Sequence, residues 1–454
     1  MPKRIVLISV NTCTTPYPVY PLGVSHVAAA LRAAGRDVDI LDINCDRDRI
    51  AATLRAARPG LVGLSLRNID DVNIDTRQLY VPDLVSTVAL VRGEVSCPVV
   101  LGGSAFSLFP RQLMEMSGAD YGVQGEGEEA VCLLAAALEN GTPVDGIPGL
   151  VFRRDGTLVC NPRRLFDPAG ISLPLRPVHM ADYYLSRSHM FNIQTQRGCP
   201  FTCCYCTYPL IDGTRTRHRD PGDVAEELAR AVAAGAHYFF FVDSVFNTDN
   251  DRAAAVCEAM IRRNLSVHWC CFLRPKNISA DLMDLMARAG LRHVEFGTDS
   301  FCDRVLEAYG KRFTFDDVLQ SSDLARAHKV YYAHFLVAGG PGETEETLRE
   351  GFANSRRIRK TVIFPYIGMR LYPGTPLYES ALGDGTVKPS DDLLKPFFYI
   401  TPGLSGERIR ELLLGFKQES MNWMFGETPP ELAAVADRLR QKGVEGPLWE
   451  FLIR

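Results

Sequence analysis

Three cysteines are spaced so that their thiolates could hold an inorganic cluster. Cys199, Cys203 and Cys206 form a Cys-x3-Cys-x2-Cys run, which should lie on a loop after the extended stretch 191–196. A cubane iron–sulfur cluster has four irons and normally takes four cysteine ligands. Three cysteines leave one iron open, and chemistry can take place at an open iron. The spacing therefore favours a 4Fe–4S cluster that takes part in a reaction.

Other chemistries stay open for the same run. A structural zinc ion takes four ligands, usually from two separated Cys/His pairs, so its fourth ligand would have to be Cys204 or a distant residue. A disulfide is disfavoured because four cysteines within eight residues cannot pair without strain. The cysteines could also be buried thiols that bind nothing.

The run resembles the signature of the radical S-adenosylmethionine (radical SAM) enzymes, including an aromatic residue, Tyr205, just before the third cysteine. The resemblance implies that Cys199, Cys203 and Cys206 bind the cluster and are catalytic. In that family the open iron binds the amino and carboxylate groups of SAM, and the reduced cluster cleaves SAM to a 5′-deoxyadenosyl radical. Cys204 is then an extra thiol, which we expect to pack against the protein.

The sequence around and after the cysteines alternates between strands and helices. Beyond the strand at 191–196, strands are expected at 238–242, 267–273, 292–297, 330–337 and 362–371, and helices at 223–233, 252–262, 280–289, 315–327 and 344–358. With six βα units, residues 191–384 resemble the partial (β/α)6 barrel of the radical SAM core. Active sites of barrels lie at the carboxyl ends of the strands.

The segments after these strands supply the residues expected to contact SAM. The resemblance implies that Asp243 and Ser244 lie near its amino group and that 339–341 lie near its adenine. An ionised acid accepts paired hydroxyl hydrogen bonds well, so Asp299, or in reserve Glu295, should hold the ribose. The full expected set for SAM is Tyr205, Asp243, Ser244, Arg274, Glu295, Asp299, Gly339, Gly340, Pro341 and Arg370.

Residues 1–140 show the same alternation. Strands are expected at 4–10, 38–43, 61–66, 98–103 and 121–123, and helices at 22–34, 49–57, 81–92, 111–116 and 128–138. This pattern favours a doubly wound, Rossmann-like parallel sheet, whose ligands bind beyond the carboxyl ends of the strands. The loops at those ends span 11–22, 67–79, 102–110 and 124–128. Glycines in them would let a bulky ligand approach the backbone.

Together these loops resemble the cobalamin-binding domain that precedes many radical SAM cores, in which Ser65 and the pair Gly102-Gly103 match positions flanking the cobalamin tail. The Asp-x-His-x-x-Gly motif that supplies a histidine to cobalt in other cobalamin proteins is absent, so that ligation is not expected. A domain that is only structural, or that binds substrate, stays an alternative. The residues expected to contact cobalamin are Thr14, Tyr20, Leu22, Gly23, Ser65, Arg67, Asn68, Gly102, Gly103, Ser104, Gly125, Glu126, Gly127 and Glu128.

The remaining segments and the composition complete the predicted domain order and indicate which classes of protein to exclude. Residues 141–190 are expected to form a linker with a hairpin over 149–159, and residues 385–454 a helical cap with a helix over 405–421. A net charge of −4 gives no basic footprint for nucleic acid. No apolar run approaches the roughly 20 residues of a membrane span. Scattered cysteines and an N-terminus without signal-peptide features favour the cytoplasm.

The order of the two domains predicts a cobalamin-dependent radical SAM enzyme that methylates an unactivated carbon of a small metabolite, supplied with electrons by a reductant such as flavodoxin or ferredoxin. One alternative keeps the core but changes the outcome to cyclisation, rearrangement or transfer of the 3-amino-3-carboxypropyl group of SAM. Another is a non-catalytic cobalamin or iron–sulfur sensor. The sequence does not identify the substrate.

Overall fold

The computed structural model describes residues 4–426 and 430–453 and divides into two compact units. The first unit holds the described residues up to Val72, Thr76–Tyr184 and Leu210–Gly213. The second holds Asn73–Asp75, Leu185–Pro209 and the described residues from Thr214 onward. Residues 1–3 of the predicted first domain, and 427–429 and 454 of the predicted cap, lie outside the described residues.

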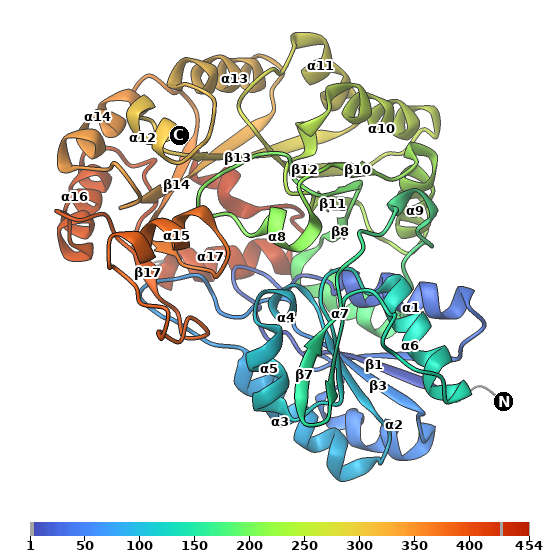
Figure 1. The fold of residues 1–454 in the computed structure, drawn as a ribbon. Helices are drawn as coiled ribbons and strands as arrows, with labels where there is room; N and C mark the ends of the chain where they lie inside the picture. Colours follow the sequence, from blue (N-terminus) through green and yellow to red (C-terminus); the bar gives the residue numbers. More distant parts are fainter. Residues whose placement is uncertain (1–3, 427–429, 454) are drawn as a thin grey trace. The chain divides into compact units, whose positions relative to one another are not determined.

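The first unit is built on a sheet with the order β2-β1-β3-β4-β5-β6-β7 (Figure 1). The strands β1 to β5 are parallel, which confirms the Rossmann-like prediction. Their apolar side chains are buried, as expected for strands covered by helices on both faces. The strands are β1 (Ile5–Ser9), β2 (Val38–Asp42), β3 (Leu61–Ser65), β4 (Val99–Gly102), β5 (Tyr121–Val123), β6 (Leu150–Arg154) and β7 (Thr157–Cys160).

The connections of this sheet determine where a ligand would bind. Because β1 lies between β2 and β3, the chain leaves β1 towards one side and later continues on the other. The crevice at such a switch point is the usual ligand site of doubly wound sheets. The helices are α1 (Leu22–Ala33), α2 (Ile50–Ala57), α3 (Val81–Glu94), α4 (Ser104–Leu108), α5 (Pro110–Ser117) and α6 (Glu128–Asn140).

The predicted hairpin is present as β6 and β7. Asp155 and Gly156 both have positive φ, as a tight two-residue turn requires. The sequence analysis placed this hairpin in a linker, whereas β6 pairs antiparallel with β5 and extends the sheet. Leu150, Val151 and Phe152 are buried there, so the hairpin shares the core of the first unit. The helix α7 (Val178–Ser188), which the sequence analysis did not identify, follows it.

The second unit contains a parallel sheet whose strands are neighbours in chain order, β8-β11-β12-β13-β14-β15 (Figure 1). Both β8 and β15 are edges among the described residues, so the sheet there is an open arc. This agrees with the predicted partial barrel. The strands are β8 (Phe191–Ile193), β11 (Tyr238–Phe241), β12 (His268–Leu273), β13 (Leu291–Asp299), β14 (Tyr331–Ala338) and β15 (Val362–Ile367).

Helices of the second unit begin at side chains that cap them. Oxygens of Asp220, Asp249, Ser279, Thr314 and Thr344 accept backbone N–H groups of the first turns, which fixes each helix start after its strand. The helices are α9 (Pro221–Ala233), α10 (Asn250–Arg262), α11 (Ala280–Arg288), α12 (Asp303–Ala308), α13 (Phe315–Ala327) and α14 (Glu345–Ser355).

The C-terminal region is helical, and the predicted helix over 405–421 is confirmed as α16 (Gly406–Glu419). The sequence analysis did not identify α17 (Pro430–Gln441) or the 3-10 helix η4 (Leu448–Leu452). Among the described residues, no helix combines the length and apolarity that a membrane span requires. The shorter elements are α8 (Tyr208–Asp212), α15 (Pro376–Gly383), β9 (Gln196–Arg197), β10 (Arg217–His218), β16 (Met369–Arg370) and β17 (Phe398–Tyr399).

Candidate active site

The three cysteines lie on the loop that follows β8 and β9 in the second unit. Cys199 is buried, and Cys203 and Cys206 are partly buried. The backbone N–H of Cys206 donates to the carbonyl of Cys203 at 3.2 Å, which closes a turn between these two cysteines. Burial raises the pKa of the Cys206 thiol to about 12. Burial therefore disfavours a free thiolate at Cys206.

The spacing of the three sulfurs tests which group fits. A tetrahedral zinc ion with bonds of about 2.3 Å to sulfur holds its sulfurs about 3.8 Å apart. Among the described residues, the set whose ligand atoms all lie within 4.8 Å of one another does not include these cysteines. A four-iron cluster is larger and binds each thiolate at a different iron. The loop thus fits a cluster better than a single ion.

Asp243 fixes the chain where it enters this loop. Its carboxylate accepts hydrogen bonds from the Thr195 N–H at 2.7 Å, the Thr195 hydroxyl at 2.6 Å and the Gln196 N–H at 3.0 Å. Burial raises the pKa of Asp243 to about 6. Ser244 donates from Oγ to the carbonyl of Gly198 at 3.2 Å, directly before the first cysteine. The predicted contact of these residues with SAM stays a prediction.

Asp299, Tyr205 and Lys311 form a buried cluster against the loop. The Tyr205 hydroxyl donates to Asp299 Oδ2 at 2.5 Å, and Lys311 Nζ lies 2.6 Å from the same oxygen. Asp299 has a φ of 66°, a conformation that a non-glycine residue adopts only when its surroundings hold it there. The sequence analysis missed Lys311. Its signal was weak, since one lysine after a short helix is usually solvated.

Arg274 holds the loop from another side. Its guanidinium lies 4.4 Å from the centre of the Phe201 ring and donates to the carbonyl of Arg312 at 3.0 Å. Cys204 is tied by its backbone, because its N–H donates to the Tyr309 carbonyl at 3.0 Å and its carbonyl accepts the Leu377 N–H at 2.8 Å. The expectation that Cys204 packs against the protein agrees with these contacts.

The other residues expected near SAM are bound within the protein. Gly340 donates from its N–H to the Tyr309 hydroxyl at 3.0 Å, and Gly339 donates to Glu343. Pro341 follows them and is partly exposed. Arg370 is buried and donates to the carbonyls of Leu371 and Leu393. These contacts shape the segment after β14 and β15, and the roles towards SAM stay predictions.

Glu295 is separated from the cysteine loop. It lies on β13 four residues before Asp299 and accepts a hydrogen bond from Trp449 Nε1 at 3.2 Å. Burial raises the pKa of Glu295 to about 7. Of the two candidate acids, the structure therefore brings Asp299, and not Glu295, to the cysteine loop.

In the first unit, the loops after β1, β3 and β4 are bound to one another. Ser104 donates from Oγ to the Arg67 carbonyl at 2.7 Å, and the Asn68 N–H donates to Asn11 Oδ1 at 2.9 Å. Gly103 has a φ of 97°, and a Cβ there would lie 2.3 Å from the Leu66 carbonyl oxygen. A Cβ at Gly102 would meet nothing within 4 Å. Open space at Gly102, beside Ser65 at the switch point, fits the approach of a bulky ligand.

Other residues expected near cobalamin lie in the rest of the loop after β1 and at the start of α1. Tyr20 is buried, donates to the Leu175 carbonyl at 3.1 Å and lies under the Arg176 guanidinium. Its ring is therefore part of the core. Thr14 is exposed, and a Cβ at Gly23, beside Leu22 at the start of α1, meets nothing within 4 Å.

The loop after β5 is also bound to the protein. The Gly125 N–H donates to Ser107 Oγ at 2.9 Å, and Glu126 accepts the Phe166 N–H at 2.7 Å. A Cβ at Gly127 would lie 3.1 Å from Val27, and Glu128 is buried at the start of α6. These contacts leave the loops after β1, β3 and β4 as the better candidates for a ligand.

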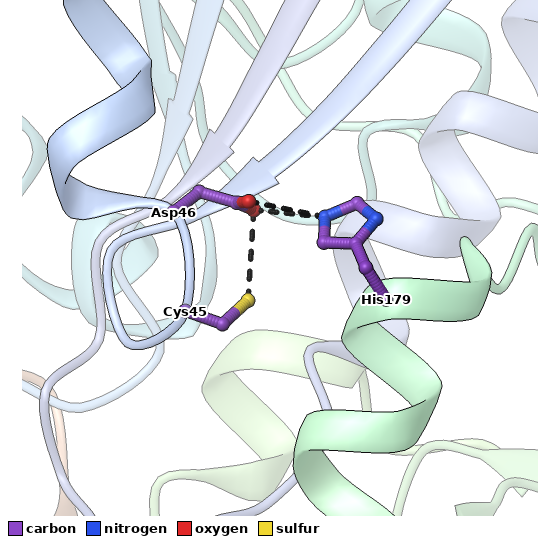
Figure 2. Close-up of side chains that lie close together, drawn as sticks. All are labelled: Cys45, Asp46 and His179. Carbon is purple, nitrogen blue, oxygen red and sulfur yellow. Dashed lines mark hydrogen bonds and ion pairs between the residues drawn. The ribbon is translucent and has the colours of Figure 1, made fainter.

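A second cluster of potential metal ligands lies in the first unit and was not predicted. Figure 2 shows Cys45, Asp46 and His179, whose ligand atoms lie within 4.8 Å of one another. His179 Nε2 lies 3.1 Å from both Asp46 oxygens, and Cys45 donates from Sγ to Asp46 at 3.5 Å. Arg49 also pairs with Asp46 at 3.1 Å. The carboxylate is thus already satisfied, and the cluster joins α7 to the loop after β2.

Comparison with known proteins agrees with this architecture. Residues 8–135 match the family described as B12 binding domain, and residues 193–352 match the Radical SAM superfamily. Tryptophan 2-C-methyltransferase of Streptomyces laurentii is 27% identical over 81% of this chain and 73% of that protein. Anaerobic magnesium-protoporphyrin IX monomethyl ester cyclase of Rubrivivax gelatinosus is 25% identical over 95% of this chain and 78% of that protein.

A solved structure shares the fold over the whole chain. The radical S-adenosylmethionine methyltransferase TsrM from Kitasatospora setae, solved with cobalamin and a [4Fe-4S] cluster bound, matches with a TM-score of 0.87. The two sequences are 24% identical, and the match covers 100% of this chain and 97% of that chain. TsrM has also been solved with tryptophan substrate and a SAM analog.

Proposed function

This chain belongs to the radical SAM enzymes that carry a B12-binding domain ahead of the radical SAM domain, and we propose that it is a cobalamin-dependent methyltransferase acting on an unactivated carbon of a small molecule. The observation that carries the proposal is the pairing of two sites in one chain. One unit has a three-cysteine loop with no fourth cysteine ligand at cluster spacing. The other has open space at Gly102, at the end of β4 and beside the end of β3, which borders the switch point of the sheet.

When bound, the cluster and SAM supply a radical that removes a hydrogen atom, and cobalamin supplies a carrier for the methyl group. Cys199, Cys203 and Cys206 would hold the cluster. Asp243 orients the chain into their loop, while the ion pair of Asp299 and Lys311 supports the loop through Tyr205. Asp243, Asp299 and Lys311 are buried, which limits access of water to one side of the loop, where water would otherwise intercept reactive species. SAM-binding roles for Asp299 and the segment 339–341 are part of the proposal.

We also propose the source of the electron, the location of the protein and the bounds of its domains. A reductant of the flavodoxin or ferredoxin class would supply the electron, and a cytoplasmic location suits a chain with 13 cysteines. We assign the cobalamin-binding part to residues 1–140 together with the hairpin of segment 141–190 that extends its sheet, the radical SAM core to 191–384 and the cap to 385–454.

The test compares two glycines with open space at their Cβ positions. We expect anaerobically purified protein, expressed with added cobalamin, to hold about one cobalt and about four irons per chain. Gly102→Leu should lower the cobalt content several-fold and leave the iron content unchanged. Gly93→Leu, on the exposed side of α3, also fills open space and serves as the matched control. Wild-type protein without cobalt but with an intact cluster would contradict the proposal.

The cyclase relative supports a second candidate, because it matches 95% of this chain. A cyclisation would use the same cluster and SAM contacts without net transfer of a methyl group. Product masses separate these reactions: methylation adds about 14 Da, a cyclisation adds no group from SAM, and transfer of the 3-amino-3-carboxypropyl group would add about 101 Da. With SAM carrying a deuterated methyl group, label in the product would support methylation, and an unlabelled product would support cyclisation.

A further inference from the structure

The two faces of the second unit's sheet have different surroundings. Residues alternate between the faces along each strand. On one face, Phe239, Trp269, Phe296, Tyr332 and Ile363 are almost fully buried under the helices. On the other face, aromatic side chains of β11, β12, β14 and β15 are partly exposed: Phe240, Phe272, Phe335, Phe364 and Tyr366. This second face is therefore only partly covered, because Tyr238, Cys270, His293, Ala333 and Val362 on it are buried while these aromatic side chains are not.

The exposed aromatic residues form two groups with β13 between them. Phe240 and Phe272 have ring centres 5.0 Å apart on β11 and β12. Phe335 lies 5.2 Å from Phe364 and 6.4 Å from Tyr366, on β14 and β15. The strand order β11-β12-β13-β14-β15 places the two groups on opposite sides of β13.

On this face, β13 offers a carboxylate and open space. Glu295 pairs with Phe272 on one side and with Ala333 on the other, so it belongs to the same face as the aromatic residues. Gly297 follows on the same face, and a Cβ there would meet nothing within 4 Å. A planar ring could therefore lie over Gly297 between the two aromatic groups, with Glu295 at its edge.

Glu295 is a buried acid without a cation. It is 6% exposed, and no ion pair among the described residues includes it. Its hydrogen bond is the one from Trp449 Nε1 to Oε1, which leaves Oε2 without a partner in the part of the chain that the structure describes. A buried carboxylate is costly unless it is paired, so a positively charged ligand group would complete this position.

The Trp449 contact is itself fixed. Glu450 accepts hydrogen bonds from Arg292 at 3.1 Å and from His293 at 3.1 Å, which anchors η4 to β13. The His293 ring lies 5.0 Å from the Trp449 ring, edge to face. These contacts hold Trp449 and η4 against β13 and so support the orientation of the Glu295 carboxylate.

The cysteine loop lies further along the same strand. Asp299, which contacts Tyr205 of that loop, is four residues beyond Glu295. At a rise of about 3.3 Å per residue, the two positions are about 13 Å apart along β13. A second molecule can therefore lie between Glu295 and whatever the cysteine loop binds.

We propose that Glu295 binds the ammonium group of an aromatic amine substrate, whose ring lies over Gly297 between the Phe240–Phe272 and Phe335–Phe364 pairs. This inference rests on the proposed function and adds the substrate class to it. The charged hydrogen bond orients the amine, and the aromatic side chains provide apolar contact for the ring. Glu295 is thus a specificity-determining residue, distinct from the acid at the cysteine loop.

The test uses two probes that share a ring and differ in charge. Binding of tryptamine and of indole-3-propionate to the reconstituted enzyme with SAM is measured by isothermal titration calorimetry. We expect tryptamine to bind at least about tenfold more tightly than the propionate, and Glu295→Gln to reduce that ratio to about one. Gly297→Leu should weaken both probes, while Gly93→Leu should weaken neither.

Each outcome either supports or contradicts the proposed amine site at Glu295. Equal affinities in the wild type, no binding of either probe, or a ratio unchanged in Glu295→Gln would overturn it. Formation of 5′-deoxyadenosine from SAM by the wild-type enzyme is measured separately. If SAM is not cleaved but tryptamine still binds more tightly than the propionate, the proposed function is wrong and the amine site stands. If SAM is cleaved but the two probes bind equally, the amine site is wrong and the proposed function stands.

Discussion

Two groups of potential metal ligands differ in how their ligand atoms are already engaged. The carboxylate of Asp46, in the cluster with Cys45 and His179, takes hydrogen bonds from His179, Arg49, Cys45 and the Asp42 backbone. Among the described residues, no charged side chain hydrogen-bonds to a sulfur of Cys199, Cys203 or Cys206. The carboxylate of the first group is thus already satisfied by protein groups, and the sulfurs of the second group have no such contact among the described residues.

The comparison shows that proximity alone does not make a metal site. The ligand atoms of the Cys45 cluster are closer together than those of the cysteine loop, yet a cation there would have to displace Arg49. The cysteine loop has a nearby cation too, Lys311, but that cation is paired with Asp299. Its charge still favours the thiolate of Cys203, against the burial that raises the pKa of that thiol.

The largest expected effect is the loss of iron when a cysteine of the three-cysteine loop is replaced. Cys203→Ser should lower the iron content of the reconstituted protein from about four per chain to less than about one, because two cysteines cannot retain the cluster. Cys45→Ser should leave the iron content unchanged. Iron analysis and the electron paramagnetic resonance signal of the reduced protein measure both variants. Full iron in Cys203→Ser, or loss of iron in Cys45→Ser, would reverse the assignment of the two groups.

An intermediate effect is expected at the ion pair that supports the loop. Asp299→Asn leaves Lys311 as a buried, unpaired cation and should cost about 3–5 kcal/mol of local stability. Hydrogen exchange of peptides that span β13 and α12 measures this loss. The double variant Asp299→Asn/Lys311→Met removes both charges and should recover much of it. If the double variant were as unstable as the single one, the ion pair would not be the cause.

The smallest expected effect is on stability, at the cluster of Cys45, Asp46 and His179. His179→Ala removes a hydrogen bond to Asp46 from a side chain that is 40% exposed, so it should cost only about 0.5–1.5 kcal/mol. Exchange of backbone amides in the loop after β2 reports this change. Iron content should be equal to that of the wild type, and a drop in iron would show that this cluster contributes to metal binding.

Local patterns were sufficient to predict most of the architecture. Apolar strands such as Leu61–Ser65 and capping residues such as Thr314 act within a few positions, and both sheets follow from them. Such local patterns could not predict which residues hydrogen-bond to a buried polar side chain. Tyr205 meets Asp299 across 94 residues, and Glu295 meets Trp449 across 154. Tyr20 was placed near a ligand because its loop follows β1; its contacts with α1 and Arg176 were not predicted, and its role towards cobalamin stays a prediction.

The hydrogen bond between Glu295 and Trp449 can form only late in the synthesis of the chain. The strands of the second unit's sheet pair in chain order, so β11 to β14 can associate as each is made. Trp449 comes 154 residues after Glu295, and at about 5–20 residues per second it is made about 8–30 s later. During that interval the new sheet exposes its aromatic face and an unpartnered carboxyl group. The residue that selects the substrate therefore gains its protein partner among the last steps of assembly.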